Sequence, residues 1–178
     1  MHRHIIASIT SAEQIREAVS GSIGRVNLMT GDITTLGQVI EQLHDAGKKV
    51  YVHMEMVNGL GRDASAVNYL ADVFKVDGIV TTKSNAVSAA RQAGIRSIQR
   101  IFAIDSGAVE TGIRMVHSSK PDEVELMPGL MPRIIREVRR KITQPLIVGG
   151  LIRSEDEVRE ALKSGADFVS VGHPVFWR

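Results

Sequence analysis

The sequence contains no cysteine and few aromatic residues. Its 178 residues include no Cys, and Phe, Trp and Tyr together make up 4% of them. The absence of cysteine excludes disulfides, thiol catalysis and thiolate metal sites, and it agrees with a reducing compartment. The scarcity of aromatic rings leaves few side chains on which nucleic-acid bases could stack.

Long apolar runs and an excess of one charge are also missing. No apolar stretch approaches the roughly 20 residues that cross a membrane, and the first ten residues, MHRHIIASIT, lack the apolar region of a signal peptide. The chain has 22 basic and 20 acidic residues, a formal net charge of +2, so its overall charge does not argue for a nucleic-acid partner. We therefore expect a cytoplasmic protein without a membrane segment.

Eight short apolar runs alternate with segments whose apolar residues follow a helical spacing, such as Leu36, Val39, Ile40 and Leu43. Strict alternation of this kind implies parallel strands joined by right-handed crossovers, and eight units favour a closed barrel over an open sheet. We expect one α/β domain over residues 1–178, a small (β/α)8 TIM-like barrel. The predicted strands cover residues 4–8, 26–30, 49–54, 78–82, 96–102, 123–127, 145–149 and 168–172.

The chain is short for this architecture, which usually takes about 200–250 residues. It ends at Arg178, soon after the eighth predicted strand. The last helix is therefore expected to be short or missing, reduced to a single turn at HPVFW. A second copy of the chain, in a homodimer, could cover the resulting gap.

Two of the apolar runs end in glycine near the C-terminus. Gly149 and Gly150 follow the seventh run, and Gly172 and His173 follow the eighth. In (β/α)8 barrels the loops after strands 7 and 8 commonly hold a phosphate, because glycine lets main-chain N–H groups approach it closely. The pattern predicts a phosphate site of a small metabolite at these four residues. The alternative is that the glycines only make tight turns.

Charged and polar residues lie within or after the other predicted strands, at the end where barrels carry their chemistry. They could gather over one small molecule, although Arg100 and Glu125 could instead form a buried ion pair that only fixes packing. A His–Glu pair could also ligate a metal, but two ligands are too few to predict one. The lysine could form a Schiff base or hold an anion as a point charge. The candidates are His53, Glu55, Lys83, Arg100 and Glu125.

A strongly basic helical segment, PRIIREVRRK, covers residues 132–141. Its apolar residues can pack inward while its cations form a stripe that suits a nucleic-acid backbone. The alternative is the solvated outer face of a barrel helix. The candidate RNA-binding residues are Arg133, Arg136, Arg139, Arg140 and Lys141.

Several segments resemble the glycerol-3-phosphate-responsive antiterminator family, regulators of glycerol uptake operons. The resemblance runs through almost the whole chain and implies a small (β/α)8 barrel that binds glycerol 3-phosphate and the leader of a messenger RNA, so that transcription continues past a terminator. The most specific segments are IQRIFAIDSGAVETGI and ELMPGLMP, supported by KKVYVHMEMVNGLGRD, DGIVTTKSNAVSAARQAGIRS and PLIVGGLI.

The family pattern carries over residue by residue, with three departures. Glu55 stands where Asp is usual, Gly172 and His173 stand where a small hydroxyl residue and an amide are expected, and Thr10 stands where the family tends toward a basic residue. The departures at Thr10 and at Gly172 and His173 bear on the exact ligand more than on the fold. The matching positions are His53, Gly59, Leu60, Thr81, Thr82, Lys83, Gln99, Arg100, Phe102, Asp105, Ser106, Glu125, Pro128, Gly129, Gly149, Gly150, Leu151 and Ile152.

Three functions are compatible with these patterns. The first is a ligand-gated RNA-binding transcription antiterminator without catalysis, whose effector is glycerol 3-phosphate and which needs no other cofactor. The second is a barrel enzyme of isomerase or lyase type on a small phosphorylated substrate, with Glu55 or Glu125 as base and Lys83 as electrophile. The third is a phosphate-ester binding protein that signals through another protein. Fold alone does not decide between them.

Overall fold

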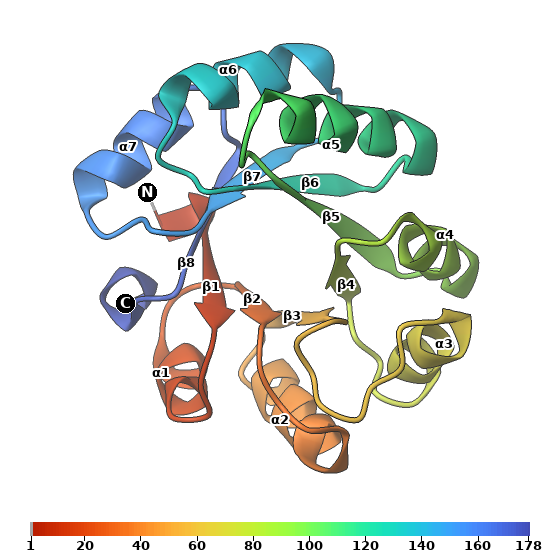
Figure 1. Ribbon diagram of the computed structural model, residues 1–178. Coiled ribbons are helices and arrows are strands. Elements are labelled where there is room, and N and C mark those ends of the chain that lie inside the picture. Colours follow the sequence, from red (N-terminus) through yellow and green to blue (C-terminus); the bar gives the residue numbers. More distant parts are fainter. Residues whose placement is uncertain (1) are drawn as a thin grey trace.

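The computed structural model describes residues 2–178 and shows eight parallel strands that close into a barrel in sequence order (Figure 1). This confirms the predicted (β/α)8 fold. Four predicted strands extend one or two residues too far, because residues 29–30, 54, 82 and 172 already belong to loops. The strands are β1 (Ile5–Ile9), β2 (Arg25–Leu28), β3 (Lys49–His53), β4 (Gly78–Thr81), β5 (Arg96–Phe102), β6 (Glu123–Met127), β7 (Leu146–Gly149) and β8 (Phe168–Val171).

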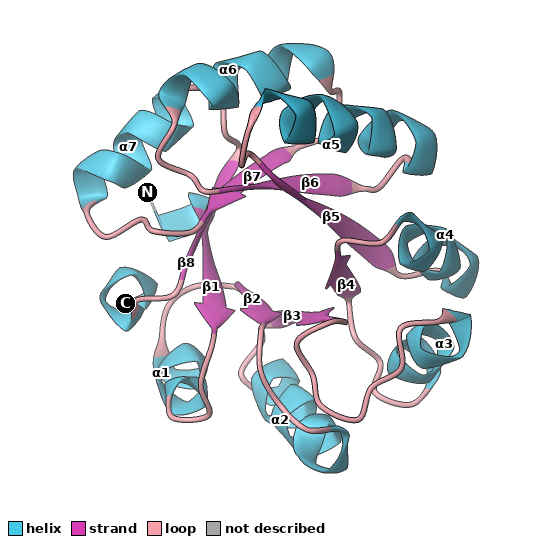
Figure 2. Ribbon diagram, in the orientation of Figure 1, coloured by secondary structure: helices cyan, strands magenta, loops and turns pink. Residues whose placement is uncertain are grey.

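Helices surround the ring of strands (Figure 2). Short 3-10 helices, η1 (His2–His4) and η2 (Pro174–Trp177), stand at the two ends of the described chain, and η2 takes the place of an eighth α-helix, as predicted. The α-helices are α1 (Gln14–Ser20), α2 (Ile33–Asp45), α3 (Ala64–Asp72), α4 (Ser84–Ala93), α5 (Ser106–Ser119), α6 (Pro132–Lys141) and α7 (Glu155–Lys163).

Side-chain caps fix where several helices begin. Asp32, Asp63 and Asp105 each accept a hydrogen bond from a main-chain N–H in the first turn of the following helix. Ser154 and Glu157 form a complete capping box at the start of α7. Four of the loops that leave the carboxyl ends of the strands are therefore anchored by their last residues.

The buried side chains form two separate clusters. The larger one fills the space between strands and helices, and the smaller one lies inside the ring and contains Ile6, Tyr51, Val80, Ile98 and Ile147. Since side chains alternate between the two faces of a strand, the residues in register with this inner cluster also face the interior. The interior is therefore apolar at mid-height and polar toward both ends.

Trp177 closes the gap left by the absent helix. Its side chain is fully buried, its Nε1 donates to the Val171 carbonyl over 3.0 Å, and its own carbonyl accepts from Ser22 N over 2.8 Å. The outward-facing Val169 and Val171 of β8 are also buried in the single chain. The packing therefore removes the reason for invoking a covering partner, and dimerisation stays a prediction.

The amino-terminal end of the barrel is sealed by an ion pair. Arg25 of β2 pairs with Glu123 of β6 across the interior, and its guanidinium lies 4.1 Å from the Tyr51 ring centroid. The opposite end of the ring carries the small and polar residues, so the candidate site lies there.

Candidate functional site

The loop after β7 holds two consecutive residues in the left-handed backbone region. Gly150 has φ of +81° and Leu151 has φ of +65°. The leucine conformation is strained, by about 1–2 kcal/mol for a residue with a side chain, and such strain tends to occur at functional sites. The main-chain N–H groups of both residues form no hydrogen bond within residues 2–178. This loop therefore presents unused donors at the carboxyl end of the barrel.

The loop after β8 presents donors of the same kind. The Gly172 carbonyl accepts from Gln14 Nε2 over 2.8 Å, and the ring of the exposed His173 accepts from Val175 N over 3.3 Å. The N–H groups of Gly172 and His173 themselves have no acceptor in the described part of the chain. Because β7 and β8 are neighbours, four unbonded N–H groups lie at the ends of adjacent strands.

Gln14 of α1 also ties the first loop to the last. Besides donating to Gly172, its Oε1 accepts from Thr10 N over 2.8 Å and from Ser11 N over 3.3 Å. Thr10, the departure from the family pattern at strand 1, is thus exposed and held by Gln14. This arrangement orients the Gly172 loop without occupying its donors.

Gly149 makes room for a buried polar network. Glu125 is fully buried; Ser170 Oγ donates to its Oε1 over 2.6 Å, and Arg100 Nε donates to its Oε2 over 2.8 Å. A Cβ atom added at Gly149 would lie 2.0 Å from Ser170 Oγ. The glycine is therefore needed for the network. The buried ion pair between neighbouring strands, which the sequence analysis kept as an alternative for Arg100 and Glu125, is present.

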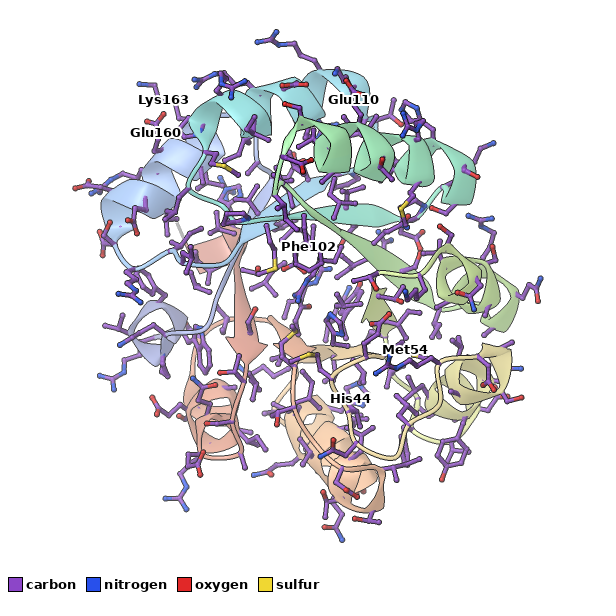
Figure 3. All side chains as sticks on the ribbon, in the orientation of Figure 1. His44, Met54, Phe102, Glu110, Glu160 and Lys163 are labelled. Carbon is purple, nitrogen blue, oxygen red and sulfur yellow. The ribbon has the colours of Figure 1, made fainter. Side chains whose placement is uncertain are left out.

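Arg100 reaches beyond this network. Its Nη2 lies 3.6 Å from the sulfur of Met29, just after β2, so its guanidinium crosses the interior toward the other side of the ring. Phe102, two residues further along β5, is 44% exposed and lies near the centre of the ring in Figure 3. Both side chains therefore belong to the mouth of the barrel.

His53 and Glu55 lie together, although not for the predicted reason. The strand ends at His53, and a turn closed by the Met56 N to His53 carbonyl bond carries Glu55, so the two do not share one extended strand. His53 Nδ1 lies 3.2 Å from Glu55 Oε2, within ion-pair distance but without hydrogen-bond alignment. The predicted pair is present, held by a turn.

The other oxygen of Glu55 has three donors. Its Oε1 accepts from Thr81 Oγ1 over 2.6 Å, from Thr82 N over 3.1 Å and from Thr82 Oγ1 over 3.3 Å. Burial alone would raise the pKa of Glu55, but His53 and these donors lower it to about 2. The carboxylate is therefore ionised throughout the physiological range.

Lys83 does not join the interior group. It is exposed at the N-cap position of α4, and its main-chain N–H donates to Thr81 Oγ1 over 3.1 Å. The structure thus brings His53 beside Glu55 and Arg100 beside Glu125, and leaves Lys83 on the rim.

The basic residues of α6 differ in how they are engaged. Arg136 bonds to Ser164 over 3.2 Å, Arg139 pairs with Asp167 at 3.1 Å, and Lys141 pairs with Glu137 at 3.0 Å. Arg133 and Arg140 are exposed, and neither forms a hydrogen bond or ion pair with the residues that the structure describes. The stripe is present on the outer face, with two cations fully available.

No group of three or more His, Asp or Glu side chains within residues 2–178 could hold a metal ion. The same part of the chain has no helix long and apolar enough to cross a membrane.

Sequence reasoning missed two residues of this region. Ser170 is a polar residue inside an otherwise apolar run, the same signal that drew attention to Arg100 and Glu125. Applying that criterion to every strand would have found it. Gln14 had no such signal, because its role comes from contacts between loops 158 residues apart in sequence.

A family model, "Glycerol-3-phosphate responsive antiterminator", matches residues 5–177. The chain belongs to this family. The antiterminator family resemblance seen in the sequence is thereby confirmed.

Two solved structures and one sequence relative agree with this membership. A glycerol uptake operon antiterminator regulatory protein from Listeria monocytogenes is 29% identical with a TM-score of 0.93, over 97% of this chain and 94% of that one. An antiterminator-related protein from Thermotoga maritima is 34% identical with a TM-score of 0.87, over 99% of both chains. An uncharacterised Escherichia coli protein, YgcP, is 30% identical over 97% of this chain and 91% of its own length. The match therefore extends over whole chains.

Proposed function

We propose that this protein is a glycerol-3-phosphate-responsive, RNA-binding transcription antiterminator that regulates glycerol uptake and metabolism genes in the cytoplasm. The observation that carries the proposal is the set of four unbonded main-chain N–H groups at the ends of β7 and β8, in a chain of this family. Such donors suit a phosphate group. The proposed phosphate site comprises Gly149, Gly150, Gly172 and His173, and the unbonded N–H of Leu151 adds a donor to those of Gly150, Gly172 and His173.

Small side chains support room for a ligand beside these donors. The interior-facing positions of β7, β8 and β1 nearest the mouth carry Gly149, Ser170, Gly172 and Ser8. Ser8 keeps part of its surface exposed, so this side of the interior is open to solvent. The same end of the barrel also holds the polar side chains His53, Glu55, Arg100 and Glu125, which we propose line the rest of the ligand site, with Lys83 on the rim as an additional positive charge.

A contact between loops suggests how the ligand could act on RNA binding. Gly129 N donates to the Gly150 carbonyl over 3.3 Å, and α6 begins three residues later at Pro132. A phosphate held by the Gly150 loop would favour one arrangement of the loop that precedes α6. A ligand that binds this arrangement more tightly shifts the population toward it. The RNA surface we propose is the exposed face of α6, with Arg133 and Arg140 at its two ends.

The geometry gives little support to an enzyme. A general base works best with a pKa near the operating pH, whereas the pKa of Glu55 is about 2. Both oxygens of Glu125 are engaged by Ser170 and Arg100. Lys83 is exposed, whereas a lysine that forms a Schiff base is typically desolvated.

The proposal is tested by titrating a leader RNA of the chain's own glycerol genes with and without glycerol 3-phosphate, at two salt concentrations. The expected result is ligand-dependent binding that weakens steeply with salt. Arg133→Glu with Arg140→Glu should weaken RNA binding about tenfold or more and leave ligand affinity unchanged, because two phosphate contacts become repulsive.

The matched control is Arg16→Glu with Lys49→Glu, which makes the same change in charge at exposed positions away from α6. Equal losses in the two double variants would move the RNA surface away from α6. Absence of RNA binding together with turnover of the phosphate ester would refute the regulatory proposal.

A further inference from the structure

Asn27 of β2 is a buried polar side chain to which no role has yet been given. Its exposed fraction is 0%, and neither Oδ1 nor Nδ2 has a hydrogen-bond partner among residues 2–178. Buried amides in folded proteins nearly always have partners, so an unpartnered one calls for a specific explanation. A ligand or a water molecule with matching groups would supply it.

The side chain faces the inside of the barrel. Asn27 is in register with Ser8 of β1 and Tyr51 of β3, and Tyr51 belongs to the inner cluster. Its chain neighbours Val26 and Leu28 belong to the outer cluster instead. By strand alternation, Asn27 therefore points into the interior.

Asn27 itself is fully buried, so a ligand would reach it past a neighbouring residue. Ser8, directly beside Asn27 in the sheet, is partly exposed, whereas Met29, the next interior position along β2, is contacted by Arg100. A ligand would therefore approach Asn27 on the β1 side, next to Gly172 of the β8 loop. This approach starts where the proposed phosphate donors lie.

The spacing of the strands fits a short ligand with polar groups at both ends. Gly172, Ser8 and Asn27 lie on three consecutive strands, β8, β1 and β2, each about 4.8 Å from the next. A three-carbon phosphate ester with its phosphate at the Gly172 loop can bridge these two spacings. Its hydroxyl end would then meet the serine hydroxyl and the unpartnered amide.

Resting on the proposed function, we propose that Asn27, assisted by Ser8, binds the hydroxyl groups of the effector and sets the specificity for short polyol phosphates over phosphate esters without hydroxyls. The amide offers one acceptor and two donors, which a vicinal diol can satisfy. Sites that hydrogen-bond a ligand hydroxyl discriminate strongly against analogues that lack it, because the buried polar groups are left unpaired.

The experiment compares glycerol 3-phosphate with propyl phosphate, which has the same carbon chain and no hydroxyls, by calorimetry. The wild-type protein should prefer glycerol 3-phosphate by about tenfold to a hundredfold, since two hydroxyl contacts are at stake. Asn27→Leu, of similar volume, should lose most of this preference while its affinity for propyl phosphate changes less than about threefold. Ser8→Ala should lose part of the preference. It provides the test if Asn27→Leu does not fold.

Several results would overturn the inference. Equal wild-type affinities for the two esters would do so without any variant. A folded Asn27→Leu protein with the full preference, or Ser8→Ala with an unchanged one, would show that the amide binds water or only shapes the interior. Failure of the wild-type protein to bind either ester would instead refute the proposed function itself.

Discussion

At the residue scale, the acidic side chains of the mouth are fixed by hydrogen bonds before any ligand arrives. Glu55 accepts from Thr81 and Thr82, and Glu125 accepts from Ser170 and Arg100. Fixed carboxylates orient their neighbours and cost little reorganisation on binding. This favours a site that recognises a molecule over one that transfers protons.

The hydrogen bonds of Glu55 predict a pH-dependent contribution to stability. Its pKa falls from 4.5 to about 2 on folding, so its ionised form stabilises the native state by at most about 3 kcal/mol. This contribution is complete above pH 4.5 and is lost as the pH falls through about 2. The free energy of unfolding of the wild type minus that of Glu55→Gln should be constant from pH 7 to about 5 and then shrink toward pH 2. A difference that does not vary with pH would contradict the assignment.

The Arg100–Glu125 pair predicts a large effect from a single truncation. Arg100→Met would leave the fully buried Glu125 carboxylate without its cation, and breaking a buried pair in this way costs about 3–5 kcal/mol. Arg96→Met, on the same strand but 54% exposed and 3.6 Å from Glu123, should cost less than about 1 kcal/mol. Urea unfolding measures both; similar losses would show that the interior pair is not desolvated as described.

The sequence indicated the polar interior only in part. Arg100 and Glu125 were predictable because charged residues inside apolar runs are costly unless paired. Asn27 and Ser170 carry the same signal more weakly, since neutral polar residues also occur on exposed strand faces. The hydrogen-bond partners of Glu55 could not be predicted. They depend on the conformation of the turn after β3, which the alternation of apolar residues in the strand does not determine.

At the scale of elements, the short η2 segment packs where the eighth α-helix of a full (β/α)8 barrel would lie. Its place in the fold was predictable from the HPVFW motif that follows the eighth strand. Its packing was not predictable, because the bond from Ser22 N to the Trp177 carbonyl joins residues from opposite ends of the chain. The buried ring of Trp177 thus covers the surface that an eighth helix would cover.

Trp177 should therefore be among the most sensitive positions of the barrel. Trp177→Ala removes a fully buried side chain and is expected to cost about 3–5 kcal/mol in the free energy of unfolding. Val175→Ala in the same turn removes a side chain that is 60% exposed, and should cost less than about 0.5 kcal/mol. Thermal or urea denaturation separates the two, and a mild effect of Trp177→Ala would mean that the seam between β8 and α1 is closed by other contacts.

At the scale of the whole molecule, the Gly129–Gly150 hydrogen bond joins the loop of the candidate ligand site to the loop that precedes the candidate RNA surface. The order of strands, the parallel topology and the glycine-rich ends of β7 and β8 were all predictable from the alternation of patterns. The identity of the unbonded N–H groups was not predictable, since it depends on the hydrogen bonds that Gln14, His173 and Ser154 make to the loops.

The most direct test of the central claim follows the main-chain amides by 1H–15N NMR while glycerol 3-phosphate is added. The N–H resonances of Gly150, Leu151, Gly172 and His173 should shift together and saturably. Gly172→Ala should bind the ester at least tenfold more weakly, because the added Cβ would crowd the donors. Its stability should be unchanged, because that Cβ would meet only Ser8 O, at an ordinary contact distance of 3.6 Å. Gly24→Ala, with nothing within 4 Å, is the matched control and should bind normally. Saturable shifts elsewhere with these four amides unmoved would contradict the account.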